Sequence, residues 1–576
     1  MKFKFLAPIA AMICFIAVSP LSYGQLTEEK VPNGWHLKDA QKDGFSGISL
    51  DKAYEFVKGR KSKTVIVAVI DSGVDTTHED LKGILWVNPK EIPGNGKDDD
   101  KNGYVDDING WNFLGGRDGR NVKEDSYEVH RVYYGWKDKY EGKEIDVKKL
   151  SAEEKYQYET WLRAKQEMEE SKAKGKETNV ESLKQDYTDT KQNYEDVVMM
   201  DSLLQSHLGK KSFGYDDIKN ISSEDKSIKR AKAVFTYLME ANNLKDKENR
   251  DILQGFGEYV EYLAGEVRKA EAGQSAPIDY RGSVVMDKYG DIKDQYYGNA
   301  DVMASTPFHG THVSGIIGAV RNNGLGIDGV ADNVRIMSIR AVPDGDEHDK
   351  DIALAIRYAV DNGAQVINMS FGKYFSPEKK WVDEAVQYAS SKGVLLVHAA
   401  GNESRNVDSM PSFPNAYFWD NGKKATNWIN VGASGDLGLD QMDPNGEKYN
   451  SLTASFSNYG KQDVDVFAPG MKIYSTIPGG NTYGIAQGTS MAAPVVAGMA
   501  AFILSYFPDL SPEQVKFVIE SSSTKTDQLV RIPGTSKDVP LSQISKTGGL
   551  VNLYEAVKLA ATLKGERGNP SNKKPF

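Results

Sequence analysis

Runs of β-branched and aliphatic residues alternate along this chain with amphipathic segments that stop at a glycine. The runs that predict buried strands are residues 63–70, 334–342, 364–372 and 394–402. The segments with helical spacing are residues 351–363 and 381–393, whose last residues, Gly363 and Gly393, stand where helix C-caps belong. Strand–helix–strand alternation with short links is typical of a parallel sheet covered by helices. We therefore expect a domain of the α/β class with a parallel sheet.

The length and charge of the chain limit its class. With 576 residues, the chain is long enough for roughly two to four domains. Its 39% hydrophobic and 26% charged residues are ordinary for a soluble globular protein. The net charge of −10 argues against nucleic acid as a partner, because nucleic-acid binding normally needs a basic surface.

The first residues have the pattern of an export signal. Lys2 and Lys4 precede an apolar run over residues 5–18, and small residues follow it up to a cleavage point after Gly24. This pattern predicts a signal peptide over residues 1–24, and the alternative is an N-terminal anchor helix. No second run is long enough to span a membrane, so we expect no stable membrane span in the mature protein. The predicted location is periplasmic, cell-surface or secreted.

The chain has a single cysteine, Cys14, which falls within the predicted signal peptide. The mature chain is therefore expected to have no disulfide bond. An exported protein without disulfides needs another means of stabilising its fold. Bound calcium is one candidate.

Residues 121–276 differ in composition from the rest of the chain. Over residues 131–271, Lys, Arg, Asp and Glu make up 55 of 141 residues, about 39%, against 26% for the whole chain. Apolar residues near the end of this stretch have helical spacing: Ile252, Phe256, Val260, Leu263 and Val267. We predict a mostly helical, charged insertion. The alternative is a partly disordered, solvated segment.

The insertion divides the predicted α/β domain into two parts. We expect residues 25–120 to form the N-terminal part and residues 277–565 to form the remainder. Residues 566–576 are rich in Gly, Pro, Asn and Lys and are expected to form a flexible tail.

Four polar residues stand where a site is expected in an α/β protein. Asp71 directly follows a predicted strand, and ligand sites of such sheets lie at the carboxyl ends of the strands. His309 lies in a glycine-rich run, Asn402 ends another predicted strand, and Ser490 begins a predicted helix in "GTSMAAP". Each residue alone has a structural explanation, as a cap, a core histidine or a turn former. Zinc binding by His309 and His312 is rejected, because no Glu lies between them and no third ligand is evident.

Five motifs of this chain occur in the same order in one protein family. They are "VIDSGVD", "HGTHVSGIIGA", "NMSFG", "AAGN" and "GTSMAAPVVAG". Outside the insertion, over roughly residues 45–110 and 295–565, the chain resembles the subtilisin-like serine proteases, the subtilases. The resemblance implies a three-layer α/β/α fold with a mainly parallel central sheet, to which the helical insertion is added. It also implies a serine endopeptidase that acts on protein or peptide substrates without a catalytic cofactor.

The resemblance implies a role for each of the four polar residues. Ser490 would be the nucleophile, and His309 the general base that takes its proton and returns it to the leaving amine. Asp71 would hold the imidazole in the required tautomer. Asn402 and the backbone N–H of Ser490 would stabilise the negative oxygen of the tetrahedral intermediate.

The resemblance also implies where the substrate lies. Two segments are similar to those that line the pocket for the residue before the cleaved bond: Ser370, Phe371 and Gly372, and Ala399, Ala400 and Gly401. An extended substrate would pair beside them as an added strand.

An acidic loop over residues 98–107 is the candidate for structural calcium. Asp98, Asp100 and Asn102 fit the spacing D-x-[DN]-x-[DN]-G, and Asp106 follows at the ninth position. The twelfth position lacks the Glu of an EF-hand, so we expect a calcium loop of another kind. Acidic loops of this sort also occur in subtilases. The alternative is a solvated acidic turn.

Two other functions compete with an exported endopeptidase. One is an exopeptidase that trims oligopeptides, because tripeptidyl-peptidase-type subtilases also have a large insertion between the catalytic Asp and His. The other is a non-catalytic binding module on the same fold. The insertion separates Asp71 from His309 and would border the substrate cleft. We expect it to limit access, to bind a partner, or to form a contact between two copies of the chain.

Overall fold

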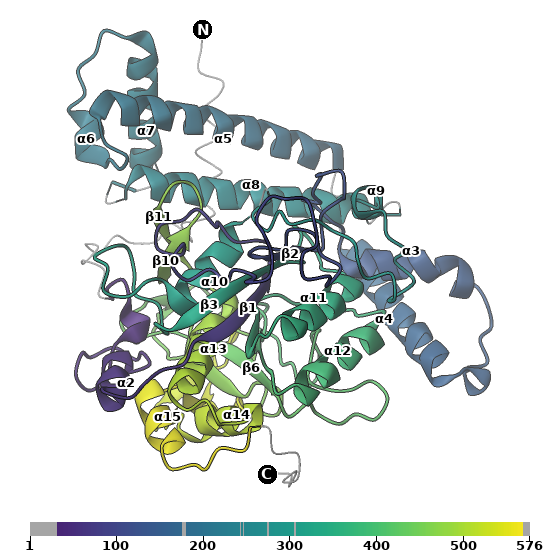
Figure 1. The fold of residues 1–576 in the computed structure, drawn as a ribbon. Coiled ribbons are helices and arrows are strands. Elements are labelled where there is room, and N and C mark those ends of the chain that lie inside the picture. Colours follow the sequence, from purple (N-terminus) through teal and green to yellow (C-terminus); the bar gives the residue numbers. More distant parts are fainter. Residues whose placement is uncertain are drawn as a thin grey trace. The chain divides into compact units, whose positions relative to one another are not determined.

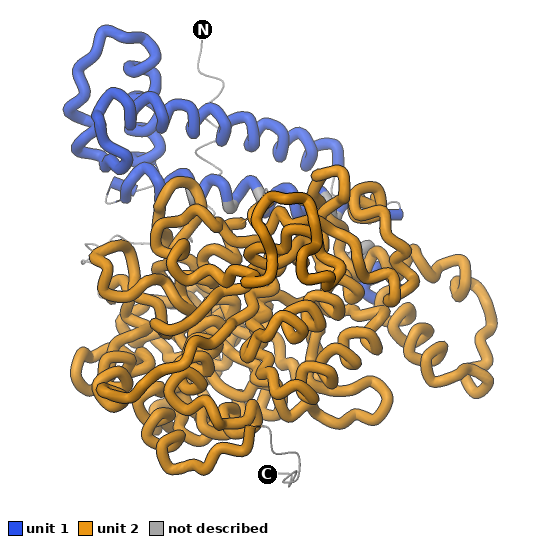
Figure 2. The backbone as a smooth tube through the Cα atoms, viewed as in Figure 1, with its two compact units in different colours: residues 1–26, 165–277 blue, residues 27–164, 278–576 orange. Residues whose placement is uncertain are grey.

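The computed structural model describes residues 31–174, 180–241, 244–245, 247–272, 276–304 and 307–567. The chain divides into two compact units, shown in different colours in Figure 2. We call residues 27–164 and 278–576 the α/β unit, and residues 1–26 and 165–277 the helical unit. The predicted signal peptide lies outside the described residues, as does the predicted tail from residue 568 onward.

A nine-stranded sheet forms the centre of the α/β unit (Figure 1), in the order β12-β15-β9-β6-β5-β4-β1-β3-β2. Its described pairs are parallel except β12 with β15. The strands are β1 (Val65–Asp71), β2 (Gly110–Asn112), β3 (Val334–Arg340), β4 (Val366–Met369), β5 (Leu395–Ala399), β6 (Trp428–Ser434), β9 (Val466–Pro469), β12 (Thr524–Lys525) and β15 (Gly549–Leu550). The four strands predicted from the sequence are β1, β3, β4 and β5.

Helices and short hairpins complete the α/β unit. The helices are α2 (Leu50–Val57), α3 (Glu128–Tyr140), the first part of α4 (Ala152–Lys174), α9 (Gly282–Val285), α10 (Phe308–Gly318), α11 (Asp349–Asp361), α12 (Lys379–Ser391), α13 (Thr489–Tyr506), α14 (Pro512–Ser521) and α15 (Leu553–Ala560). Short 3-10 turns are η1 (Trp35–Leu37), η2 (Val147–Lys149) and η3 (Leu541–Gln543). The hairpins pair β7 (Gln441–Met442) with β8 (Lys448–Tyr449), β10 (Ile473–Ile477) with β11 (Thr482–Ala486), and β13 (Leu529–Arg531) with β14 (Asp538–Pro540). The two predicted helices are α11 and α12.

Alternate residues of the central strand β1 enter two different cores. Val65, Val67 and Val69 belong to a core that contains residues of α10 and α13. Ala68 and Ile70 belong to a second core, which contains residues of α11 and α12. Successive side chains of a strand point to opposite faces, so helices cover both faces of the sheet. The predicted three-layer α/β/α fold is confirmed.

The helix α13 is the central helix of the first core. Among the described residues it is the one helix that is long and apolar enough to cross a membrane. However, 89% of it is buried, and it packs against β4, β5, β6 and β9. Its apolar composition is therefore explained by the core of the α/β unit.

The helical unit consists of the rest of α4 with α5 (Val180–Leu208), α6 (Tyr215–Lys219), α7 (Lys226–Ala241) and α8 (Asn249–Ala272). The five apolar residues with predicted helical spacing, from Ile252 to Val267, all lie in α8 and are buried. Ile252, Phe256 and Val260 join a core with residues of α5 and α7. Residues 121–164 of the predicted insertion, which carry α3 and the start of α4, belong instead to the α/β unit.

Candidate active site

Three segments that carry candidate residues leave the same edge of the sheet. β1 ends at Asp71, Ser370 directly follows β4, and Asn402 comes shortly after β5. Since β1 pairs in parallel with β4, and β4 with β5, the carboxyl ends of these strands lie side by side. The strand order also reverses at β1, which lies between β3 and β4. Sheets of this class open a crevice for ligands at such a point.

His309, the second residue of α10, forms a pair with Asp71 at this edge. Its Nδ1 lies 2.8 and 2.9 Å from the two carboxylate oxygens. The Asp71 side chain is 3% exposed, whereas 36% of the His309 side chain is open to solvent. Burial lowers the pKa of His309, but the charge of Asp71 and its hydrogen bond raise that pKa more, so it lies above its ordinary value. The pair therefore stabilises an imidazole that has taken up a proton at Nε2.

The glycine after His309 explains how α10 reaches this edge. A Cβ placed on Gly310 would lie 2.2 Å from the carbonyl oxygen of Gly73 and 3.1 Å from Cβ of Asp71. The first distance leaves no room for any side chain, so the first turn of α10 packs directly on the backbone after β1. This close approach brings His309 within hydrogen-bond distance of Asp71.

Ser490, the second residue of α13, exchanges two hydrogen bonds with Ser370. The Ser490 hydroxyl donates to the Ser370 carbonyl oxygen at 3.1 Å, and the Ser370 hydroxyl donates to the Ser490 carbonyl oxygen at 2.9 Å. In an unbroken helix the N–H of residue 494 would donate to that carbonyl, but Pro494 has no N–H. Ser370 supplies the missing donor. In the part of the chain that the structure describes, the Ser490 hydroxyl thus bonds Ser370 rather than His309.

Asn402 is held by the residue before the candidate nucleophile. Its Oδ1 accepts hydrogen bonds from the N–H and the Oγ1 of Thr489 at 2.8 and 3.0 Å. With Oδ1 engaged, the amide nitrogen Nδ2 is the group left to face a substrate. A Cβ placed on Gly488 would lie 3.4 Å from Asn402 Nδ2 and 3.6 Å from Ser490 N. Asn402 Nδ2 and Ser490 N therefore both lie close to one point beside the start of α13.

Sequence reasoning missed two residues that hold the Asn402 segment. Thr489 Oγ1 also accepts a hydrogen bond from Gly401 N at 3.0 Å. Asn458 is fully buried, and its Nδ2 donates to the Ala400 carbonyl oxygen at 2.9 Å while its Oδ1 accepts from Glu403 N at 3.1 Å. The hydroxyl of Thr489, next to Ser490, was a signal that could have been used. No local pattern marks Asn458.

The two predicted pocket segments follow neighbouring strands. Ser370, Phe371 and Gly372 come after β4, whereas Ala399 ends β5 and is followed by Ala400 and Gly401. Gly401 has a φ of 102°, a conformation that favours glycine, and a Cβ on it would lie 2.3 Å from Asn458 Nδ2. Both segments therefore lie at the edge that carries the other candidate residues.

Three carboxylates of the acidic loop region gather at one point. Ligand oxygens of Glu91, Asp98 and Asp100 all lie within 4.8 Å of one another. Glu91 is 7% exposed, and its Oε1 accepts hydrogen bonds from the N–H groups of Asp99 and Asp100. Its Oε2 is buried without a hydrogen-bond partner among the described residues. A buried, unpartnered carboxylate oxygen beside two further carboxylates fits a hard cation such as calcium. Sequence reasoning missed Glu91, which lies outside the loop pattern.

The other two predicted calcium ligands make different contacts. The Asn102 side chain accepts from Tyr104 N at 2.8 Å and donates to Asp107 at 3.0 Å. The two carboxylate oxygens of Asp106 accept from Asn95 N and Gly96 N at 3.2 and 2.8 Å. The structure therefore brings Asp98 and Asp100 together with Glu91, while Asn102 and Asp106 brace the loop.

His312 has a structural environment. Its Nε2 lies 3.0 Å from the Ile473 carbonyl oxygen and 3.3 Å from that of Gly484. Burial lowers the pKa of His312 to about 3, so the ring is neutral and donates to the hairpin backbone.

The α/β unit thus carries an Asp–His pair and a serine at a helix start beside one edge of a mainly parallel sheet. A sequence profile of the Subtilase family matches residues 62–537. This chain belongs to the subtilase family.

Several relatives carry protease names. The chain is 41% identical over 258 residues to "Thermophilic serine proteinase" of Bacillus sp. (strain AK1), covering 43% of this chain and 56% of that protein. It is 34% identical over 298 residues to "Thermitase" of Thermoactinomyces vulgaris, covering 50% of this chain and 90% of the relative. It is 38% identical over 221 residues to "Subtilisin DY" of Bacillus licheniformis, covering 38% of this chain and 70% of the relative. The chain thus spans little more than half the length of the first relative.

Proposed function

We propose that this chain is an exported serine endopeptidase that cleaves peptide bonds through an acyl-enzyme on Ser490. The observation that carries the proposal is the hydrogen-bonded pair of His309 and Asp71. This pair lies at the same sheet edge as Ser370, to which the Ser490 hydroxyl donates a hydrogen bond. The family and the protease names of the relatives support the same reaction. Export is supported by the signal pattern of residues 1–24.

In the first half-reaction, the Ser490 hydroxyl turns from the Ser370 carbonyl toward His309 and attacks the substrate carbonyl carbon. His309 takes the hydroxyl proton at Nε2, and Asp71 stabilises the imidazolium at Nδ1. The negative charge that develops on the substrate oxygen is stabilised by the amide N–H of Asn402 and the backbone N–H of Ser490. The C–N bond then breaks, and His309 gives its proton to the leaving amine.

In the second half-reaction, water takes the place of the amine. His309 removes a proton from the water as its oxygen bonds to the acyl carbon, and it later returns that proton to Ser490 Oγ as the ester C–O bond breaks. The same N–H groups stabilise the second tetrahedral intermediate. No step needs a cofactor. The extended substrate is held by the backbone of residues 370–372 and 399–401.

We further propose that Glu91, Asp98 and Asp100 hold a structural calcium ion. The unpartnered, buried Oε2 of Glu91 supports this proposal. A bound calcium ion would neutralise the three carboxylates and fix the loop, and it takes no part in the hydrolysis. It would also supply stability to a mature chain that has no cysteine.

The test is digestion of unfolded casein by the chain from Gln25 onward, beside the Ser490→Ala variant. An endopeptidase produces internal fragments, and these should be absent with the variant. Release of short N-terminal peptides from otherwise intact casein would point to an exopeptidase. Failure of the wild-type chain to cleave casein or short peptides would contradict the proposal and favour a binding module.

A further inference from the structure

The predicted pocket segment of residues 370–372 is followed by a buried lysine, Lys373. This lysine forms an ion pair with Glu128, a residue of the predicted insertion. Lys373 directly follows Gly372 and is 3% exposed. Its ammonium donates to the Glu128 carboxylate at 2.6 Å and to the Glu347 carbonyl oxygen at 2.7 Å, and it pairs with Asp349 at 2.8 Å. An ammonium has three donors, so these contacts use all of them. Lys373 therefore acts on the segment around it rather than on a substrate.

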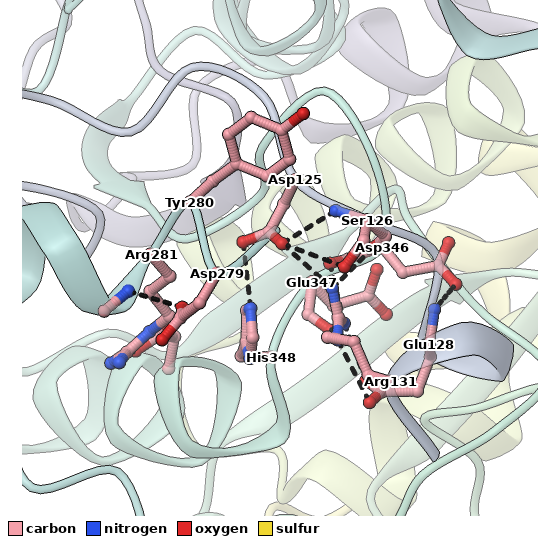
Figure 3. A network of polar contacts seen from close by, with 12 residues as sticks. Asp125, Ser126, Glu128, Arg131, Asp279, Tyr280, Arg281, Asp346, Glu347 and His348 are labelled. Carbon is pink, nitrogen blue, oxygen red and sulfur yellow. Dashed lines mark hydrogen bonds and ion pairs between the residues drawn. The ribbon is translucent and has the colours of Figure 1, made fainter. Parts of the chain in front are cut away.

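Glu128 opens α3, and Arg131 fixes its carboxylate from one turn further along (Figure 3). An Arg131 nitrogen lies 2.8 Å from Glu128 Oε2, and the same nitrogen donates to the carbonyl oxygens of Asp346 and Glu347 at 3.0 and 3.1 Å. Burial raises the pKa of Glu128, but the charges of Arg131 and Lys373 lower it more, so this pKa lies below its usual range. The start of α3 is thus bound both to Lys373 and to the loop before α11.

The loop before α11 is also paired with the chain just upstream of α3. Asp125 N donates to the Asp344 carbonyl oxygen at 3.0 Å, and Asp344 N donates to the Lys123 carbonyl oxygen at 2.8 Å. His348 Nε2 lies 2.9 Å from the Asp125 carboxylate (Figure 3). This loop follows β3, the neighbour of β1, so the first residues of the insertion lie at the sheet edge that carries Asp71.

The next helix of the predicted insertion, α4, contacts the residues that directly follow Lys373. A guanidinium nitrogen of Arg163 donates to the Tyr374 carbonyl oxygen at 2.7 Å, and the Tyr156 hydroxyl donates to the Ser376 carbonyl oxygen at 2.8 Å. The Arg163 guanidinium also lies over the Phe375 ring, 4.9 Å from its centre. Residues 373–376 are therefore held from both α3 and α4, by contacts within the α/β unit.

Residues 373–376 are linked to Asn402 through the carboxylate of Glu403. The Tyr374 hydroxyl donates to Glu403 Oε2, and that oxygen also accepts from Asn402 N at 2.9 Å. The Arg405 guanidinium lies 4.3 Å from the centre of the Tyr374 ring. A continuous set of contacts thus runs from α4 through Tyr374 to the residue proposed to bind the oxyanion.

We propose that Lys373 and Tyr374 are positioning residues. Through them, α3 and the start of α4 hold the pocket segment of residues 370–372 and the oxyanion-binding residue Asn402 in place. The first part of the insertion, residues 121–164, then belongs to the scaffold of the active site. This role is separate from any function of the helical unit. This inference rests on the proposed function, because it concerns how a peptide is bound beside Ser490.

The test compares Lys373→Met and Glu128→Gln with a matched control, Lys379→Met, in the full chain. Lys379 is a second buried lysine, 6% exposed, which pairs with Asp383 of the same helix, α12, and donates to the Tyr417 carbonyl oxygen. For each variant we would measure kcat and KM on a peptide cleaved internally, the rate of Ser490 modification by a small phosphonofluoridate, and the melting temperature. Tyr156→Phe, which removes one hydroxyl, carries the test if Lys373→Met does not fold.

We expect Lys373→Met and Glu128→Gln each to lower kcat/KM at least about fivefold. The fold-decrease in kcat/KM of the double variant should be much smaller than the product of the two single fold-decreases. Lys379→Met should lower the melting temperature and leave kcat/KM within about twofold. Folded variants that keep wild-type kcat/KM, or an equal loss in Lys379→Met, would overturn the inference while the proposed function stands. Wild-type chain that is not modified at Ser490 would instead overturn the proposed function, and the inference with it.

Discussion

Ser370 and Ser490 each donate a hydroxyl hydrogen bond to the backbone carbonyl of the other, at 2.9 and 3.1 Å. The exchange is possible because Pro494 leaves the Ser490 carbonyl without its helical donor. It ties the start of α13 to the end of β4. The candidate nucleophile and the first residue of the candidate pocket are therefore held as one structural piece.

Ser370→Ala should destabilise the protein and slow hydrolysis. The change removes the only side-chain donor described for the Ser490 carbonyl, and an unsatisfied buried acceptor costs about 1–3 kcal/mol in the free energy of unfolding. Urea denaturation measures that loss, and kcat measures the effect on Ser490. Ser505→Ala is the control, since its hydroxyl donates to Phe502 within α13. Equal effects of the two variants would argue against a special role for Ser370.

Activity should fall at acid pH with a midpoint above the ordinary pKa of histidine, near 6.5. Neutral His309 is the form that accepts the Ser490 proton, and Asp71 raises the pKa of His309, so the protonated, inactive form persists to higher pH. Asp71→Asn removes that charge. It should shift the acid limb of kcat/KM to lower pH and reduce kcat by about 10⁴-fold. An acid limb that does not move in this variant would contradict the assignment.

Asn402→Ala should reduce kcat by about 10²–10³-fold with little change in KM, because the lost N–H acts mainly in the transition state. Thr489→Val should give a smaller loss of the same kind, since Thr489 Oγ1 orients the Asn402 amide. Thr489→Ser keeps the hydroxyl and serves as its control. A change in KM alone would mean that Asn402 contributes to ground-state binding instead.

Removal of calcium should lower the melting temperature without altering the chemistry of Ser490. A ligand that binds only the folded state stabilises it, by about 2.7 kcal/mol at one hundred times its dissociation constant. Thermal unfolding with added calcium and with a chelator measures the difference. Glu91→Gln should abolish it, whereas the exposed Glu79→Gln should not. A melting temperature that calcium does not change would exclude the site at Glu91, Asp98 and Asp100.

The layers of the fold were predictable from sequence because their signals are local. Strands β1, β3, β4 and β5 follow from β-branched runs, and α11 and α12 follow from helical spacing and a terminal glycine. The candidate residues were identified from five family motifs, and Asp71 also stands at the end of a predicted strand, which is β1.

The contacts that hold those residues could not be predicted, since they join positions far apart in the chain. Lys373 and Glu128 are 245 residues apart, and nothing local to either residue indicates the other. Glu91 lies outside the spaced pattern of the acidic loop and meets Asp98 and Asp100 only in the folded chain. The boundary of the helical unit at residue 165 likewise lies inside one continuous helix, α4, without any break in composition.

The most direct test of the central claim is to find which residue a phosphonofluoridate modifies. The mature chain would be treated to complete inactivation and digested, and the adduct would be located by peptide mass spectrometry. We expect one adduct per chain, on Ser490, and a loss of hydrolysis in proportion to labelling. The His309→Ala variant should be labelled more slowly than the wild-type chain. Hydrolysis that persists in fully labelled protein, or in Ser490→Ala, would contradict the account.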